Sequence, residues 1–406
     1  MKKHLLSTSA IALGVAMAAP ASAQEWNMDW GGFANTHVGI SSVDRNFVSN
    51  VDNDGVNIYT NSEIIFSPSV TLDNGMTFGF SVQMEALNGG GGADGIDESY
   101  VTISSDTLGR VVLGSENSAG YALMGSVYTP GVSSMAINSR STSAFVPVTG
   151  SGGFRQAALS SLTEVAGNND VQRITYFTPS FSGFTLGVSY APSNAGNASN
   201  NAPVNFNSAG NVTDIFDIGA RYQQSFNGVD IGLAARWGTG ERQGSPAAAA
   251  VLATAPNAGP DGLDGTADDV AIGDVVTPAV AAVPGSDPTT WAIGGTVSAS
   301  GFTFGATYAE NDNDTGGVGD QEGWSLGATY DIAGPWTVGL STYQGEVKNG
   351  GAVPSSDYEV YLLGATRSLG SGVSWDVYYF HQETTNGTNG AKIEGDVLAT
   401  AINLSF

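Results

Sequence analysis

The final eleven residues of the chain, 396–406, alternate between two kinds of side chain. Leu398, Thr400, Ile402, Leu404 and Phe406 fall on one face, and small or polar residues occupy the other. This period of two predicts a β-strand with one apolar face. A strand of this kind would expose an apolar edge in a soluble protein, and pairing the last strand with the first in a closed barrel removes that edge. A terminal strand inside an ordinary soluble sheet is the alternative interpretation.

A seven-residue motif recurs in the second half of the chain: aromatic, any residue, apolar, Gly, apolar, any residue, Tyr. Its copies are F-T-L-G-V-S-Y at 184–190, F-D-I-G-A-R-Y at 216–222, F-T-F-G-A-T-Y at 302–308, W-S-L-G-A-T-Y at 324–330 and a looser copy from Trp336. In each copy the aromatic and apolar residues share one face, while Gly shares the other with Thr, Ser or Arg. An apolar face with aromatic residues near its ends is typical of a strand in a membrane barrel. We therefore expect the Gly-bearing face to line a water-filled interior.

The composition fits the same fold class and excludes several others. Charged residues make up 13 % of the chain, against roughly 25 % in typical soluble domains. The absence of Cys excludes disulfides, thiolate metal sites and thiol nucleophiles. A formal net charge of −25 and the scarcity of Lys and Arg exclude nucleic acid as a partner. No apolar run after residue 20 is long enough for a membrane helix.

Residues 1–23 have the three parts of a secretory signal peptide. Lys2 and Lys3 form a basic end, residues 5–19 form an apolar stretch, and Ala-Ser-Ala at 21–23 is a small-residue cleavage site. An N-terminal membrane anchor is disfavoured because the stretch is short and ends at Pro20. We expect cleavage after Ala23, export through the periplasm, and a mature barrel domain that spans residues 24–406.

Short and long connections alternate strictly along the chain. Short turns occur at 73–75, 106–109, 180–183, 226–228, 300–301, 333–335 and 369–372, and long loops at 41–56, 87–97, 116–169, 192–212, 238–289, 309–322, 346–357 and 382–395. Seven short turns and eight long loops join sixteen strands, and an even count with this asymmetry is typical of bacterial outer-membrane barrels. The predicted fold is all-β: a transmembrane antiparallel β-barrel of sixteen strands, with short periplasmic turns and long external loops. The side-chain alternation at 357–368 and 373–382 is ambiguous.

Two of the long loops differ in composition. The loop at 116–169 contains aromatic and apolar residues that could anchor it against an inner wall, whereas the loop at 238–289 contains no aromatic residue and is dominated by Ala, Pro, Gly and Asp. We expect the first, which is the third long loop, to fold into the lumen and the second to stay in water. The alternative is that these loops are disordered insertions.

The order of these features resembles that of the general diffusion porins of Gram-negative bacteria, and most closely those of alphaproteobacteria. The resemblance is carried by G-R-V-V-L-G-S-E at 109–116, R-I-T-Y-F-T-P-S-F-S-G-F-T-L-G-V-S-Y at 173–190 and the terminal strand that ends in Phe406. It implies a homotrimeric sixteen-stranded barrel in the outer membrane whose third loop narrows the pore. It also implies that Phe406 is recognised by the barrel-assembly machinery, and that the lipid bilayer and outer-leaflet lipid surround the barrel.

The candidate pore-lining residues are charged side chains on the face expected to point inward or in the third loop. They are Glu63, Glu85, Arg110, Glu116, Arg140, Arg155, Arg173, Arg221 and Arg236. We expect Glu63 to lie nearly opposite Glu85, and Arg221 to lie likewise opposite Arg236, so that separate acidic and basic patches set up a transverse field. Solvated lumen charges without a tuned role are the alternative. The surplus of acidic residues predicts a weak preference for cations.

Other functions receive less support from the sequence. The acidic loop at 258–274 lacks the spacing of an EF-hand calcium site, so a solvated loop with at most loosely bound divalent cations is expected, and no cofactor. His37 and His381 occur in no recognisable nucleophile motif, so we expect no enzyme activity, with an outer-membrane phospholipase as the enzyme alternative. We therefore predict a passive diffusion channel for ions and small hydrophilic solutes. The alternatives are a solute-specific channel and a structural or adhesive barrel.

Overall fold

The computed structural model describes residues 25–88, 95–127, 129–135, 140–149, 164–165, 169–195, 211–245, 247, 251–252, 275–277, 282, 284–314 and 319–406. The predicted signal peptide and the acidic loop at 258–274 lie outside these residues. The strands of the first half are β1 (Asn27–Arg45), β2 (Gly55–Thr71), β3 (Thr77–Asn88), β4 (Ile96–Ser105), β5 (Gly109–Glu116), β6 (Val171–Phe177), β7 (Phe184–Ser193), β8 (Val212–Phe226) and β9 (Val229–Arg242). Those of the second half are β10 (Val251–Leu252), β11 (Val275–Thr277), β12 (Thr289–Ala299), β13 (Phe302–Asp312), β14 (Gln321–Asp331), β15 (Trp336–Val347), β16 (Ser356–Gly370), β17 (Val373–Thr385) and β18 (Lys392–Ser405).

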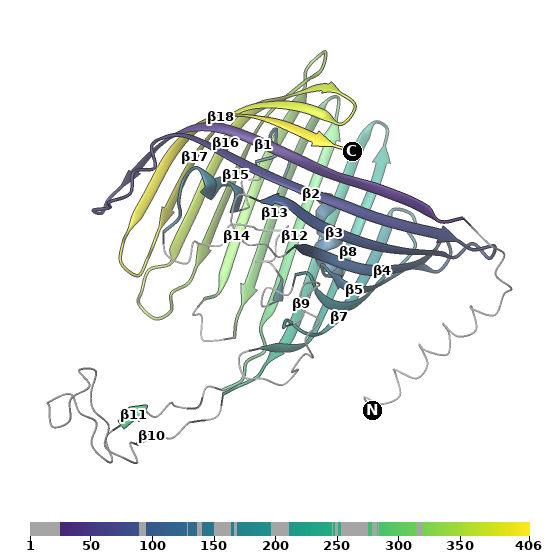
Figure 1. Cartoon of the computed structure of the whole chain (residues 1–406), viewed down its shortest axis with the longest axis horizontal. Helices are drawn as coiled ribbons and strands as arrows, with labels where there is room; N and C mark the ends of the chain where they lie inside the picture. Colours follow the sequence, from purple (N-terminus) through teal and green to yellow (C-terminus); the bar gives the residue numbers. More distant parts are fainter. Residues whose placement is uncertain are drawn as a thin grey trace.

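Sixteen of these strands form one closed antiparallel barrel (Figure 1). Each strand pairs with its neighbours in the sequence, and the barrel closes where β18 pairs with β1. Phe406 completes the closure, because its N–H donates to the Gly32 carbonyl and its own carbonyl accepts from the Gly32 N–H, each at 3.1 Å. Strands β10 and β11 form a separate two-stranded sheet, which is not part of the barrel. The predicted strand number and the pairing of the last strand with the first are confirmed.

All seven predicted short turns are present, at one end of the barrel. At Asn227–Gly228 and Ser300–Gly301 both central residues have positive φ, between 50° and 84°. This is the type I′ geometry that matches the twist of hairpin strands, and it explains why Gly follows a small polar residue at these turns. The strands extend further into the long-loop end than the alternation suggested, since β1 runs to Arg45 and β2 begins at Gly55.

The two faces of the wall separate side chains as the motif predicts. On β1 the outward Trp30 is 63 % exposed, whereas the inward His37 is 1 % exposed. Outward aromatic rings gather in two bands: Phe302 and Tyr330 stack near the short turns with centroids 4.2 Å apart, and Trp291 and Tyr308 meet near the long loops at 5.1 Å. Two such bands flanking an apolar zone are the girdles of a membrane barrel.

The ambiguous strands β16 and β17 are apolar on both faces. Leu363 points outward and is 59 % exposed, whereas its neighbour Leu362 points inward and is 3 % exposed. The inward side chains Leu362, Val360, Tyr378 and Phe380 belong to one buried hydrophobic cluster. The inner face is apolar there because it packs against a loop, and this hides the alternation in the sequence.

Candidate functional site: the lumen and loop L3

The connection between β5 and β6, residues 117–170, is called loop L3 here. It contains the helix α2 (Ala119–Met124) and the 3₁₀ helices η1 (Gly125–Val127) and η2 (Arg140–Ala144). Its described segments lie inside the barrel: α2 contacts β7, β8 and β9, η1 contacts β12 and β13, and η2 contacts β2. The third loop therefore folds into the lumen, as predicted, and follows the inner wall.

The start of L3 is held by a buried cluster of charged side chains. Ser118 caps α2 by accepting from the Tyr121 N–H at 3.2 Å. Asp217 on β8, which is 2 % exposed, accepts a hydrogen bond from the Gly120 N–H at 2.6 Å and another from Arg236 of β9. The Glu164 carboxylate accepts from the Ser118 N–H at 3.1 Å and lies 4.0 Å from the Arg236 guanidinium. Hydrogen bonds between charged partners are the stronger class, so this cluster fixes α2 to the wall.

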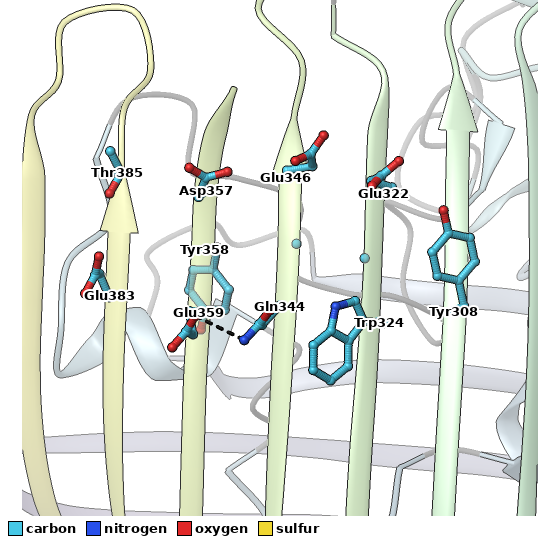
Figure 2. Close-up of a pocket in the computed structure, with 12 residues that line it drawn as sticks. Tyr308, Glu322, Trp324, Gln344, Glu346, Asp357, Tyr358, Glu359, Glu383 and Thr385 are labelled. Atoms are coloured by element: carbon cyan, nitrogen blue, oxygen red, sulfur yellow. Dashed lines mark hydrogen bonds between the residues drawn. The ribbon is translucent and has the colours of Figure 1, made fainter. Parts of the chain in front are cut away.

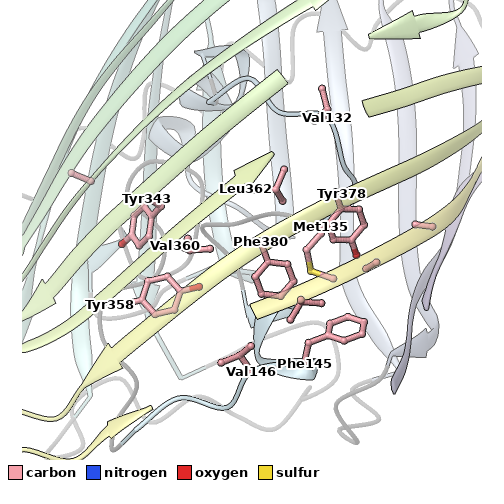
Figure 3. Close-up of a cluster of buried hydrophobic side chains, with 14 of the residues drawn as sticks. Val132, Met135, Phe145, Val146, Tyr343, Tyr358, Val360, Leu362, Tyr378 and Phe380 are labelled. Carbon is pink, nitrogen blue, oxygen red and sulfur yellow. The ribbon is translucent and has the colours of Figure 1, made fainter. Parts of the chain in front are cut away.

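The later part of L3 packs into an apolar patch of the inner wall (Figure 3). Met135, Phe145 and Val146 of L3 are each at most 3 % exposed and belong to the same cluster as Tyr358 and Phe380. The rings of Phe145 and Phe380 meet edge to face with centroids 6.3 Å apart. Full burial of such a side chain contributes about 1.5–3 kcal/mol.

Polar contacts tie the same stretch of L3 to β16 and β17. The hydroxyls of Thr142 and Tyr358 are 2.9 Å apart, and the Gln382 amide donates to the Val146 carbonyl at 2.8 Å. The Thr366 hydroxyl donates to the Val132 carbonyl at 2.6 Å. These bonds satisfy loop backbone groups that would otherwise be buried without partners.

A third contact lies where L3 meets the closing strands. The Ser134 N–H donates to Asp376 at 3.1 Å, and the Ser134 hydroxyl lies 3.2 Å from His37 Nε2. His37 Nδ1 lies 2.8 Å from the Tyr378 hydroxyl, and Asn403 bonds both Ser134 and Asp376. Sequence reasoning missed this network because its members are scattered over three strands and a loop.

The wall formed by β2, β3 and β4 carries acidic side chains toward the lumen. Glu63 and Glu85 are direct cross-strand partners, as predicted. Glu98 of β4 accepts hydrogen bonds from Gln83 and from Asn117, the latter at 2.6 Å. Residues 55–105 contain no Lys or Arg, so no basic residue of these three strands neutralises this wall.

The predicted basic residues have different surroundings. Arg173 and Arg236 are 5 % and 4 % exposed, so they lie in the wall behind L3 and do not border open water. The prediction that these two arginines line the pore is therefore wrong. Arg236 pairs in register with Gly219 and Arg221 with Ala234, so these two arginines are diagonal rather than opposite. Arg110 lies over the Phe177 ring at 4.6 Å. Arg155 and the side chain of Arg140 lie outside the described parts of the chain.

Several carboxyl groups crowd the place where L3 leaves β5 and returns to β6. Burial, together with the neighbouring carboxyl groups of Asp97, Glu98 and Glu164, raises the pKa of Asp170 to about 8. One oxygen each of Asp170, Glu164 and Glu116 is buried without a hydrogen-bond partner. Glu116, one of the predicted pore residues, thus belongs to this carboxyl cluster where L3 joins the barrel.

A second group of carboxylates lies on the outer surface near the long loops (Figure 2). Glu322, Glu346 and Asp357 are direct partners on β14, β15 and β16, and Glu359 pairs with Glu383. They border a cavity of about 350 Å³ that also contains Tyr308 and Trp324. Glu322, Glu346, Asp357 and Glu383 were missed because they fall at strand ends that the sequence analysis assigned to loops. Within the described residues, no three acidic or His side chains are arranged to hold a metal ion.

Among the described residues, no helix combines the length and apolarity needed to cross a membrane. A comparison with curated proteins returned no match. Solved structures with the same fold include an anion-selective porin from Comamonas acidovorans, with 16 % identity, a TM-score of 0.55, and 94 % of this chain and 100 % of that chain covered.

Two further structures are similar over nearly the whole barrel. OmpF from Salmonella typhi, in complex with daunomycin, has 15 % identity and a TM-score of 0.55 over 93 % of this chain and 97 % of its own. The trimer form of OmpT, an outer membrane protein of Vibrio cholerae, has 14 % identity and a TM-score of 0.53 over 94 % and 99 %. At these identities the similarity concerns the fold. The family model for Gram-negative porins matches residues 7–387, and together with the closed sixteen-stranded barrel this shows that the chain belongs to the Gram-negative porins, the diffusion channels of the outer membrane.

Proposed function

We propose that this porin passes ions and small hydrophilic solutes passively and with a weak preference for cations. The observation that supports this proposal is the asymmetry of the lumen charges. The β2–β4 wall carries Glu63 and Glu85 toward the lumen, and these strands contain no basic residue. Arg173 and Arg236 are buried behind L3.

The electrostatic reason is that a buried, paired charge contributes little to the field in the lumen. Arg236 is compensated by Asp217 and Glu164, whereas Glu63 and Glu85 face each other across one strand pair. A pore lined by one sign of charge raises the local concentration of ions of the opposite sign. The effect is weak because a Debye length of about 8 Å at physiological salt screens charges across an open pore.

The test is the zero-current potential of single purified channels in a KCl gradient. We expect the sign that corresponds to K⁺ preference, with a magnitude that falls as ionic strength rises. A potential of the opposite sign would contradict the proposed selectivity. Liposome swelling with neutral, cationic and anionic solutes of equal size then separates general diffusion from a solute-specific channel.

For His37, the enzyme alternative of an outer-membrane phospholipase has a geometric argument against it. In a hydrolase triad a carboxylate accepts from Nδ1 of the histidine, but Nδ1 of His37 faces the Tyr378 hydroxyl. His37 also points into the lumen and is 1 % exposed. We expect no release of fatty acid from phospholipid vesicles by the wild type or by His37→Ala, and release that depends on His37 would favour the enzyme.

We also propose assembly as a homotrimer, because the trimer form of Vibrio cholerae OmpT has the same fold. Unheated electrophoresis in mild detergent, checked by light scattering, should give a species of three chains. A monomer that conducts as single steps of one size would contradict this assembly.

We also propose that the N-terminal segment and Phe406 act in export and barrel assembly. Cleavage after Ala23 would leave a chain that begins at Gln24, which intact-mass measurement of the outer-membrane protein can test. Phe406 would act as the signal for the barrel-assembly machinery, and its backbone bonds to Gly32 place it at the seam of the barrel. Loosely bound divalent cations at acidic external residues remain a prediction.

A further inference from the structure

The glycine of the seven-residue motif has a role that the sequence pattern does not reveal. All five copies place it on the inner face of the wall, where it was expected to border water. Each of these glycines instead lies under loop L3 or its contacts. We name them the glycine track: Gly187, Gly219, Gly305, Gly327 and Gly339.

The track follows the course of L3 from strand to strand. A Cβ atom built on Gly187 would lie 3.1 Å from Ala119 Cβ, and one on Gly219 would lie 3.0 Å from Gly120 Cα. On β15, a Cβ on Gly339 would lie 2.9 Å from Val132 Cγ1.

The approach is closest at Pro130, which crosses β13 and β14. A Cβ on Gly305 would meet the Cδ atom of Pro130, and a Cβ on Gly327 would meet the Pro130 carbonyl oxygen, both closer than 3.0 Å. Gly305 and Gly327 are direct cross-strand partners, as are Gly187 and Gly219. Pairing of two glycines opens a shallow groove two strands wide.

Glycine inside a strand is unfavourable because it weakens the strand and offers no side chain to pack. Its recurrence at the same motif position needs a reason, and the structure shows an atom of L3 within 3.1 Å of the added Cβ at all five sites. At Gly219, Gly305 and Gly327 the atom nearest to an added Cβ belongs to L3, so L3 leaves no room for a larger side chain there. At Gly187 and Gly339 the wall itself also crowds the site, through Phe177 and the Ala328 carbonyl.

We propose that the glycine track sets how far L3 projects into the lumen, and thereby sets the cross-section of the pore. This inference rests on the channel function of the protein. Carbon atoms in contact stay about 3.5–4.0 Å apart, so one added methyl group under Pro130 must displace L3 toward the pore axis. The loop is held on either side by the Asp217 cluster and by the apolar patch, so the displacement is expected to be local.

The experiment compares single-channel conductance in KCl and the size limit for neutral sugars in liposome swelling. Gly305→Ala and Gly327→Ala are each expected to lower the conductance. They are also expected to lower the size limit, so that some sugars admitted by the wild type are excluded. Two control variants add the same methyl group where nothing lies within 4 Å: Gly370→Ala at the end of β16 and Gly125→Ala in L3 itself. These are expected to conduct like the wild type.

A second substitution distinguishes loop displacement from general damage. Pro130→Ala removes the Cγ and Cδ atoms that a Cβ at 305 would meet, so it should restore the conductance of Gly305→Ala. It should not restore Gly327→Ala, because the clash there is with the carbonyl oxygen of residue 130. Wild-type conductance in both single variants, or failure of Pro130→Ala to restore a folded Gly305→Ala channel, would overturn the inference.

Folding is followed by the shift in electrophoretic mobility on heating. If Gly305→Ala does not fold, a second pair of substitutions is used. A Cβ on Gly294 would lie 2.9 Å from Thr307 Cγ2 of the wall and 3.0 Å from Val127 Cγ2 of L3. Gly294→Ala should therefore lower the conductance, and Val127→Ala should recover part of the loss. Unchanged conductance in Gly294→Ala would then count against the inference. A wild-type protein that gives no conductance steps would overturn the channel function itself, which is a different outcome.

Discussion

The buried charged cluster that holds the start of L3 depends on a single carboxylate, that of Asp217. Asp217→Ala removes the acceptor of the Gly120 N–H and the partner of the Arg236 guanidinium, and it leaves that guanidinium buried at 4 % exposure beside Glu164. Removing one partner of a buried ion pair costs about 3–5 kcal/mol. Since about 1.4 kcal/mol changes an equilibrium tenfold, the undocked fraction of L3 should rise by more than about 100-fold.

Limited proteolysis of the folded barrel measures this change directly. We expect cleavage within L3 of Asp217→Ala at a protease concentration that leaves the wild type intact, and noisier single-channel currents. Asp217→Asn should be intermediate, because its amide oxygen can still accept from the Gly120 N–H. The matched control is Asp230→Asn on the neighbouring strand, whose carboxylate bonds Ser225 near a short turn.

One result would contradict the anchoring role of Asp217. The barrel of Asp217→Ala should keep its heat-dependent mobility shift, because the strand pairing of β8 does not depend on this side chain. If L3 of that folded variant resists protease like the wild type, the charged cluster does not hold the loop. Docking would then depend on the apolar patch alone.

Three further outcomes are expected. Glu63→Gln and Glu85→Gln should each move the zero-current potential in a KCl gradient toward the anion side, and unchanged potentials would remove these two residues from the selectivity argument. Because burial raises the pKa of Asp170 to about 8, the docked loop keeps a proton that the undocked loop loses near pH 4. Docking should therefore weaken as pH rises from about 4 to about 8 and then stay constant; Asp170→Asn should show a smaller loss of protease resistance over that range, and an identical pH profile would contradict the assignment. Deletion of Phe406 should lower the amount of trimer in the outer membrane while refolding in detergent persists, and normal assembly would show that another segment carries the signal.

The strand number, the turns and the membrane-facing side chains were predictable because they depend on local rules. A period of two is set by the pleat of each strand, and the type I′ turns at Asn227–Gly228 and Ser300–Gly301 need only two residues with positive φ. The same alternation failed on β16 and β17, where Leu362 and Leu363 are apolar on opposite faces. There the inner face packs against a loop that lies more than 200 residues away in the sequence. A local sequence pattern cannot show such a contact.

The charged residues of the lumen were likewise predictable only in part. The Glu63 and Glu85 pair was predictable, because one hairpin turn sets its register. The burial of Arg173 and Arg236 was not, since inward parity says that a side chain points into the barrel but not whether L3 covers it. Their partners Asp217 and Glu164 come from β8 and from the loop, and only folding brings them together.

By itself the sequence determined a closed, lipid-embedded barrel, because the hydrogen-bonded pleat and the contrast between hydrocarbon and water act on each residue where it stands. Only the tertiary structure decided the shape of the pore. The glycines of the repeated motif are the clearest case: their position on the inner face could be read from the letters, but their purpose could not. It depends on how closely L3 approaches the inner wall, which is decided only once L3 has docked.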